Sequence, residues 1–329
     1  EVYFMKLTKQ VKLIPSSDQK DVLDTTMAEY ISLANDLIDY GIACGSLPRL
    51  TSARVIAPLP SALKAQCVQD VRSIWSKTMK HGGKFPTLKK PVAIWNNQNY
   101  RIDDSSISFP VMIDGKCTRI SVKAEIPQEI LDILQSSKLG ALRITKKNDK
   151  YIAQIAYEVP EITASGTEIM GVDLGVLCPA VAKTSTGKVQ FYGNGRQRKQ
   201  VRRSFYSRRK KLGKSKKFKA LKKSKDKEQR WMKDQDHKIS RAIVNDAVAQ
   251  GVGTIILEKL QGIRSRARKD SPTRKSRKNN RMVNSWSFYR LAHYIEYKAR
   301  LAGIDVVYVD PAYTSQVCPH CGALHKAQG

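Results

Sequence analysis

Two acidic residues stand where strand-like segments end, and they carry the strongest chemical signal in the sequence. Asp173 follows the apolar segment 169–172 within Gly-Val-Asp-Leu-Gly, and Glu258 follows the apolar segment 254–257. A charged residue after such a run is a poor choice for a core position, because burying an unpaired charge is costly. Asp173 taken alone also fits a turn-capping residue. Together, on neighbouring strands, the two acids predict a shared metal site.

The chemistry of that site follows from its ligands. Carboxylate oxygens favour Mg²⁺ or Mn²⁺ over zinc. Two such ions about 4 Å apart can activate a water and stabilise the leaving oxygen of a phosphodiester. A site of this kind usually takes a third carboxylate, and Asp305 and Asp310 are available near the last apolar segment without being convincing candidates. The pattern predicts metal-dependent cleavage of nucleic acid.

The charge balance indicates a partner for this chemistry. The 329 residues include 59 Lys and Arg against 29 Asp and Glu, for a formal net charge of +30. Such a chain gains affinity for nucleic acid by releasing counterions from phosphates. No apolar run reaches the ~20 residues of a membrane span, and no secretory signal is visible. The six cysteines are scattered apart from Cys318 and Cys321, so these features predict a protein of a reducing cytosol that is not associated with membrane.

Two segments concentrate the positive charge. The segment 196–225 holds 16 Lys or Arg residues and no acid, and a second basic segment, 261–283, directly follows Glu258. A solvated helix or a disordered tail is the alternative reading for such runs, but their position beside the acids favours contact with a phosphate backbone. The predicted nucleic-acid-binding residues are Arg202, Arg203, Arg208, Arg209, Lys210, Lys211, Arg264, Arg266, Arg268 and Lys275.

Cys318 and Cys321 stand at C-x-x-C spacing before a glycine. Two thiolates at this spacing are typical of a zinc knuckle, and one pair is half of a four-ligand Zn²⁺ site. His320 and His325 are poor candidates for the missing zinc ligands. A redox-active dithiol is the other interpretation, but no thioredoxin-like pattern surrounds the two cysteines.

The elements needed to position these residues form two halves. In the first, an alternating strand over 6–14 precedes two amphipathic helical segments. Short Val-, Ile- and Tyr-rich segments follow over 88–165 and predict a small β-barrel or sandwich into which the helices are inserted. In the second, strands and helices in the order β-β-β-α-β-α-β predict a ribonuclease-H-like sheet with helices on its faces. The fold class is α+β and multidomain.

Six motifs, in order, carry a resemblance to a known family. They are Gly171–Gly175, Asp236-His-Lys-Ile-Ser-Arg241, Leu257–Leu260, Asn284–Tyr289, Tyr297-Lys-Ala and Val309–Gly322. In this order the chain resembles the TnpB family of transposon-encoded, RNA-guided DNA endonucleases, which are related to compact type V CRISPR effectors. The match covers about 166–322; the N-terminal half matches only in the order of its elements.

The resemblance implies a domain organisation. A wedge β-barrel takes residues 5–17 and 87–165, a helical recognition insert takes 18–86, a RuvC nuclease domain takes 166–312, and an incomplete zinc-binding element for target nucleic acid starts at 313–329. By motif, Asp173 and Glu258 correspond to the first two RuvC carboxylates. The family's third is an Asp beyond a second C-x-x-C, so we expect further chain after Gly329.

The resemblance also implies a mechanism, partners and a location in the prokaryotic cytosol, associated with the nucleoid. A noncoding guide RNA binds the basic surfaces and pairs with one strand of double-stranded target DNA, so base pairing supplies the sequence specificity. The protein reads a short flanking DNA motif, and the RuvC site cuts with Mg²⁺ or Mn²⁺. Two alternatives stay open: a cleavage-deficient, repressor-like guided DNA-binding protein, and a compact type V CRISPR effector. A strand-joining transposase is disfavoured, since neither a DDE spacing nor a Tyr nucleophile with paired His is present.

Overall fold

The computed structural model describes residues 4–162, 166–224, 226–260 and 288–310. The chain divides into two compact units, residues 1–160 and 161–329. Each unit has its own sheet and its own hydrophobic cluster of buried side chains. No helix in the described ranges is both long and apolar enough to cross a membrane.

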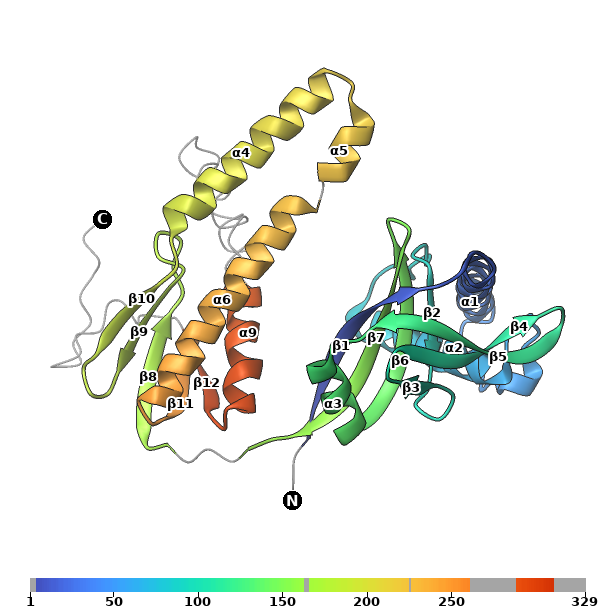
Figure 1. Cartoon of the computed structure of the whole chain (residues 1–329), viewed down its shortest axis with the longest axis horizontal. Coiled ribbons are helices and arrows are strands. Elements are labelled where there is room, and N and C mark those ends of the chain that lie inside the picture. Colours follow the sequence, from blue (N-terminus) through green and yellow to red (C-terminus); the bar gives the residue numbers. More distant parts are fainter. Residues whose placement is uncertain (1–3, 163–165, 225, 261–287, 311–329) are drawn as a thin grey trace. The chain divides into compact units, whose positions relative to one another are not determined.

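The first unit is one antiparallel sheet with helices packed against it (Figure 1). Its strands lie in the order β2-β6-β7-β1-β5-β4-β3. The long strand β1 pairs with β7 over most of its length and with β5 at its C-terminal end. The strands are β1 (Phe4–Ile14), β2 (Val92–Trp95), β3 (Arg101–Asp103), β4 (Ser106–Ile113), β5 (Lys116–Glu125), β6 (Lys138–Lys147) and β7 (Lys150–Pro160).

Two long helices stand between β1 and β2 in the sequence. They are α1 (Ser17–Ala43) and α2 (Ser61–His81), separated by the short 3₁₀ helix η1 (Ser52–Arg54). Helix α1 starts with a capping box, in which the backbone N–H of Gln19 donates to Ser16 Oγ and the backbone N–H of Ser16 donates to Gln19 Oε1. Buried side chains of both helices share one cluster with buried side chains of the sheet.

The predicted small β-barrel or sandwich is confirmed only in part. The described residues form one open, half-barrel-like sheet with β2 and β3 as its edges. Closure would need these two strands to pair, and they are the shortest of the seven at four and three residues. The segment 88–165 is also not all strands, because α3 (Gln128–Ser136) lies between β5 and β6. Its apolar residues 130, 131, 133 and 134 follow a helical period, which buries one face.

The second unit has a five-stranded sheet in the order β10-β9-β8-β11-β12. Strands β8, β9 and β10 are antiparallel neighbours, whereas β11 is parallel to both β8 and β12. Among the described residues, the predicted order of strands and helical regions is confirmed, with the helical region before β11 divided into three helices. The strands are β8 (Glu168–Asp173), β9 (Ala180–Thr184), β10 (Val189–Tyr192), β11 (Val252–Glu258) and β12 (Asp305–Val309).

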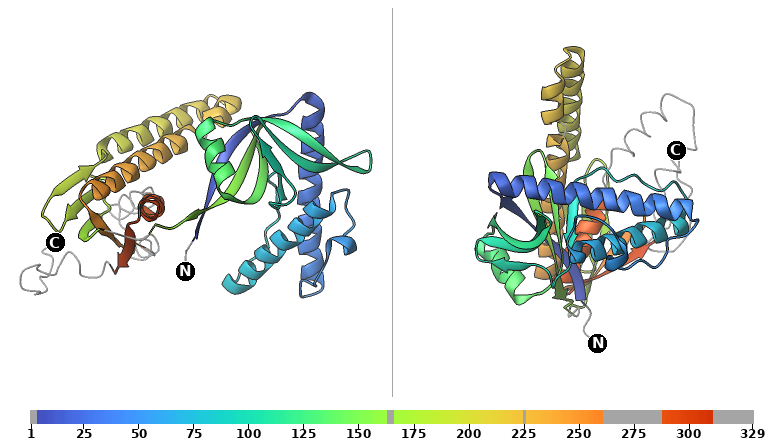
Figure 2. Two further views of the ribbon diagram at one scale, coloured as in Figure 1. Left: turned by 60° about the horizontal axis from the view of Figure 1, so that its bottom comes forward. Right: turned by 90° about the vertical axis from the view of Figure 1, so that its right-hand side faces the viewer.

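Four helices of the described residues accompany this sheet. Helix α4 (Gly195–Lys214) leads away from it, α5 (Phe218–Ser224) follows, and α6 (Lys227–Ala249) returns to it (Figures 1 and 2). Helix α9 (Phe288–Leu301) precedes β12 and packs against α6. Apolar side chains of α6 and α9 join those of β8 and β11 in one cluster, so these two helices cover the same face of the sheet.

Gly253 of β11 packs closely against the backbone of Gly166, just before β8. A Cβ on Gly253 would lie 1.9 Å from the carbonyl oxygen of Gly166, which is backbone and cannot swing aside. We expect Gly253→Ala to lower the free energy of unfolding of this unit by about 1–3 kcal/mol, as overpacking does. Gly171→Ala on β8 is the control, because its Cβ would meet nothing closer than 3.9 Å. Equal urea midpoints for the two variants would contradict this packing.

Candidate active site at the carboxyl edge of the second sheet

The two predicted acids end two adjacent parallel strands. Asp173 is the last residue of β8, and Glu258 is the last residue of β11. The register pairs Leu257 with Val172, so the next position on each strand is an acid. Neighbouring strands lie about 4.8 Å apart. The fold therefore brings together two residues that are far apart in the sequence.

Both acids belong to the same face of the sheet. Met170 and Val172 alternate with Asp173 along β8 and are buried, and their register partners on β11 are the buried Ile255 and Leu257. Because side chains alternate between faces, Asp173 and Glu258 lie on the face opposite the one that packs on α6 and α9. Asp173 is exposed and Glu258 is half-buried.

The acid pair fits a hard divalent cation by its chemistry. Both donors are carboxylate oxygens, which are the ligands that Mg²⁺ and Mn²⁺ prefer. The preceding residue on the same face of β8 is Gly171, where a side chain is absent and the nearest atom to an added Cβ is 3.9 Å away. This leaves room beside Asp173 for an ion or a phosphate.

The two further acids considered from the sequence are placed differently. Asp305 starts β12 and pairs with Thr254, so it lies at the opposite end of the strand from Glu258 and cannot join the pair. Asp310 follows Val309, the register partner of Glu258, and is exposed at the same edge. Within the described ranges, no group of three or more His, Cys, Asp or Glu side chains forms a metal site.

Helix α4 carries the first set of predicted nucleic-acid-binding residues. Arg203, Arg208, Lys210 and Lys211 are exposed along it. Arg209 instead forms an ion pair with Glu228 of α6 at 2.5 Å. Arg202 is half-buried, and burial together with the charge of Arg198 lowers the pKa of its guanidinium.

The exposed cations of α4 allow a measurement of phosphate contacts. We expect Arg203→Gln to weaken nucleic-acid affinity and to reduce the slope of log affinity against log salt by about one, the effect of losing one phosphate contact. Arg209→Gln should change the slope less, because Glu228 already neutralises that charge. Fluorescence anisotropy over a salt series measures both. A slope unchanged by Arg203→Gln would remove that residue from the interface.

Several predicted residues fall outside the described ranges. They are Arg264, Arg266, Arg268, Lys275, Cys318 and Cys321.

A buried ionic cluster links α4, α6 and α9. It was not predicted from the sequence. Asp236 is fully buried in α6, and its two carboxylate oxygens accept from Arg198 of α4 at 2.5 Å and from Arg290 of α9 at 2.6 Å. The sequence did offer one sign of this cluster. Asp236 is an acid at a position that the helical period assigns to the core. This cluster positions the helices that cover the sheet.

Two protein-family models match the chain, mostly within the second unit. A family model described as a probable transposase, OrfB_IS605, matches residues 154–264, and one described as Cas12f1-like, TNB domain, matches residues 288–328. A TnpB-like protein of Methanocaldococcus jannaschii is 36% identical over 137 residues, which are 40% of this chain and 47% of that protein. The resemblance to the TnpB family is confirmed.

The similarity extends beyond TnpB to Cas12f1 proteins. A CRISPR-associated endodeoxyribonuclease Cas12f1 of Syntrophomonas palmitatica is 26% identical over 314 residues, which are 82% of this chain and 61% of that protein. A solved Cas12f1–sgRNA–target DNA complex contains a chain of the same α+β fold, with a TM-score of 0.66, 12% identity, and coverage of 99% of this chain and 92% of that one. This chain spans about half the length of the curated relatives it matches.

Proposed function

We propose that the chain is an RNA-guided, metal-dependent DNA endonuclease of the TnpB and Cas12f type. The observation that carries the proposal is the pairing of Asp173 and Glu258 at the ends of adjacent parallel strands, on one face of the sheet. In this proposal the five-stranded sheet is the RNase-H-like core of a RuvC nuclease domain, residues 166–312. The order of its strands, three antiparallel and then two parallel, supports that assignment.

The acids would hold Mg²⁺ or Mn²⁺. When bound, the ions supply an activated water and stabilisation of the leaving oxygen in phosphodiester hydrolysis. Asp173 and Glu258 contribute two carboxylates from rigid strand ends, so their positions are set by the sheet register. The side-chain-free position at Gly171 leaves space for the phosphate beside them.

Guide RNA and double-stranded target DNA are the proposed partners. Two observations support this: the net charge of +30, and the exposed cations of α4. The chain also shares its fold with a Cas12f1 protein solved with an sgRNA and target DNA. Guide pairing would provide the sequence specificity, while the protein contacts the backbone.

The remaining assignments extend the proposal to the rest of the chain. The first unit would act as a wedge domain, residues 5–17 and 87–165, with a recognition insert at 18–86, and would read a flanking DNA motif. Cys318 and Cys321 lie in the segment that matches the TNB-domain model. They would hold Zn²⁺ together with further ligands, because a structural zinc takes four.

An alternative of a different class is a guided DNA-binding protein without cleavage activity, acting as a repressor. The acid pair is also compatible with it, because the described residues place only Asp173 and Glu258 at the site. The similarity to both TnpB-like and Cas12f1 proteins leaves the transposon and CRISPR-associated forms equally supported.

The guide is tested by purifying the protein from cells that carry its native flanking DNA and sequencing the RNA that copurifies. We expect one dominant noncoding species with a constant scaffold and a variable 3′ segment. The purified complex should then bind duplex DNA that matches the 3′ segment and carries the required flanking motif. Copurification of random RNA, or equal binding of unmatched DNA, would contradict guided recognition.

A further inference from the structure

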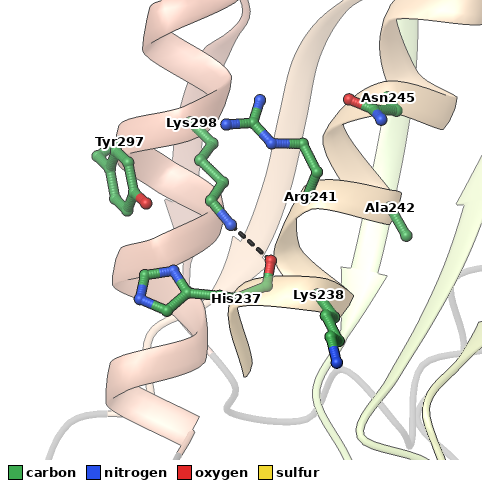
Figure 3. A pocket seen from close by; sticks show the side chains of 7 residues that line it. All are labelled: His237, Lys238, Arg241, Ala242, Asn245, Tyr297 and Lys298. Carbon is green, nitrogen blue, oxygen red and sulfur yellow. Dashed lines mark hydrogen bonds between the residues drawn. The ribbon is translucent and has the colours of Figure 1, made fainter. Parts of the chain in front are cut away.

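Two motifs from the sequence have no part in the acid site, and the structure brings them together. The Asp236–Arg241 segment lies on α6, and the Tyr297-Lys-Ala segment lies on α9. The Lys298 ammonium donates to the carbonyl oxygen of His237 (Figure 3) and to Ser240 Oγ, both at 2.6 Å. Lys298 is only 4% exposed. Its charge is therefore held at a fixed position between the two helices.

A hollow of about 530 Å³ lies against this lysine and is open to solvent. Figure 3 shows that its lining residues come from α6 and α9. The residues around it are cationic or neutral, and no acid is among those that line it in the described chain. The polar members are His237, Lys238, Arg241, Asn245, Tyr297 and Lys298.

The cations of the hollow repel one another. Burial, and after it the charge of the nearby Arg241 guanidinium, lower the pKa of Lys298 to about 8. Burial and the charge of Lys298 also lower the pKa of His237, so its imidazole is neutral near pH 7. Arg241 and Lys298 thus share a space in which no lining acid compensates them. An anion between them would relieve this repulsion.

The nearby carboxylates do not fill that role. Asp234 pairs with Lys238 at 2.8 Å, but both side chains are more than half exposed, and such pairs along a helix contribute little. The Glu296 carboxylate of α9 accepts hydrogen bonds from Arg300 and from the hydroxyl of Tyr308. Arg241 itself is exposed on α6 and points toward the hollow together with Lys298 (Figure 3).

The shape and the donors of the hollow indicate which anion it takes. Arg241, Lys298 and the Asn245 amide can all donate to phosphate oxygens. Because the hollow is open to solvent, a polymer backbone can lie across it. An enclosed cavity, by contrast, is what a small metabolite needs for most of its surface to be buried.

We propose that the α6–α9 hollow binds one phosphodiester of a nucleic-acid backbone. This rests on the proposed function, and it adds a contact that lies away from the nuclease acids, because α6 and α9 cover the opposite face of the sheet from Asp173 and Glu258. The hollow holds the nucleic acid and takes no part in its cleavage.

The experiment compares Arg241→Gln with a matched change outside the hollow. The full chain is titrated against a mixed-sequence duplex DNA and a mixed-sequence single-stranded RNA over a salt series. We expect Arg241→Gln to weaken binding of at least one probe about tenfold, as loss of a charged hydrogen bond does, and to reduce its salt slope by about one. Arg300→Gln on α9 is the control, since Arg300 pairs with Glu296 and does not line the hollow.

A photo-crosslinking residue at position 245 gives a second readout, with position 233 on the same helix as its control. Both residues are exposed, and only Asn245 lines the hollow. Crosslinks at 245 to RNA alone or to DNA alone identify which backbone enters. Equal losses for Arg241→Gln and Arg300→Gln, or equal crosslinking at both positions, would overturn the phosphate site while general binding persists. A wild-type chain that binds neither probe would contradict the site and the proposed function together.

Discussion

Replacing Asp173 by Asn is expected to stop DNA cleavage while leaving nucleic-acid binding intact. The change removes a charged metal ligand but keeps the size of the side chain at the end of β8. Metal stabilisation of the transition state contributes several kcal/mol, so the single-turnover rate should fall by about a thousandfold or more. The measurement is cleavage of guide-matched duplex DNA in Mg²⁺, with the affinity for the same DNA measured in parallel.

Asp305→Asn is the matched control for this prediction. It makes the same chemical change in the same sheet, but Asp305 pairs with Thr254 at the far end of β11 from Glu258. We expect that variant to cut at the wild-type rate. Glu258→Gln should behave like Asp173→Asn, because both acids serve one site. Undiminished cutting by Asp173→Asn would refute the assignment of the acid pair.

Replacing Asp236 by Ala is expected to have the largest effect on stability. Asp236 is fully buried, and Arg198 and Arg290 both pair with it, so its removal leaves two guanidinium groups without their shared carboxylate. Breaking a buried ion pair costs about 3–5 kcal/mol. Hydrogen exchange of peptides from α6 and α9 should show faster opening of this region, without a comparable change in the first unit.

The control for this second prediction is Asp234→Asn, two residues earlier in α6. Asp234 forms an exposed pair with Lys238 within the same helix, and such pairs contribute about 0–1 kcal/mol. Its exchange rates should match those of the wild type. If Asp236→Ala showed the same protection as Asp234→Asn, the ionic cluster would not be what holds α4 and α9 to α6.

The acid pair shows which parts of the site are predictable from the sequence. Apolar runs before Asp173 and Glu258 indicate two strands, and an acid at the end of each run indicates chemistry. The sequence does not specify that the two strands are neighbours, parallel and aligned so that the acids share one register position. That information depends on long-range packing around the cluster shared by β8, β11, α6 and α9.

The features missed from the sequence share a physical reason. The helix α3 is only nine residues long and lies among strands, so the helical period of its four apolar residues was overlooked beside the surrounding strand pattern. Asp236 carries no local sign of having two arginine partners, because Arg198 and Arg290 come from other helices. The sequence left barrel and sandwich open, because pairing at the sheet edges depends on strands only three or four residues long.

The most direct test of the central claim is cleavage of DNA by the protein with its own guide RNA, in Mg²⁺ and in EDTA. The substrate is duplex DNA that matches the guide and carries the required flanking motif, with an unmatched duplex as control. The acid pair predicts cutting of the matched duplex in Mg²⁺, and no cutting of it in EDTA or of the unmatched duplex in either condition. Stable, guide-dependent binding of the matched duplex without cutting in Mg²⁺ or Mn²⁺ would contradict the nuclease and establish the guided DNA-binding alternative.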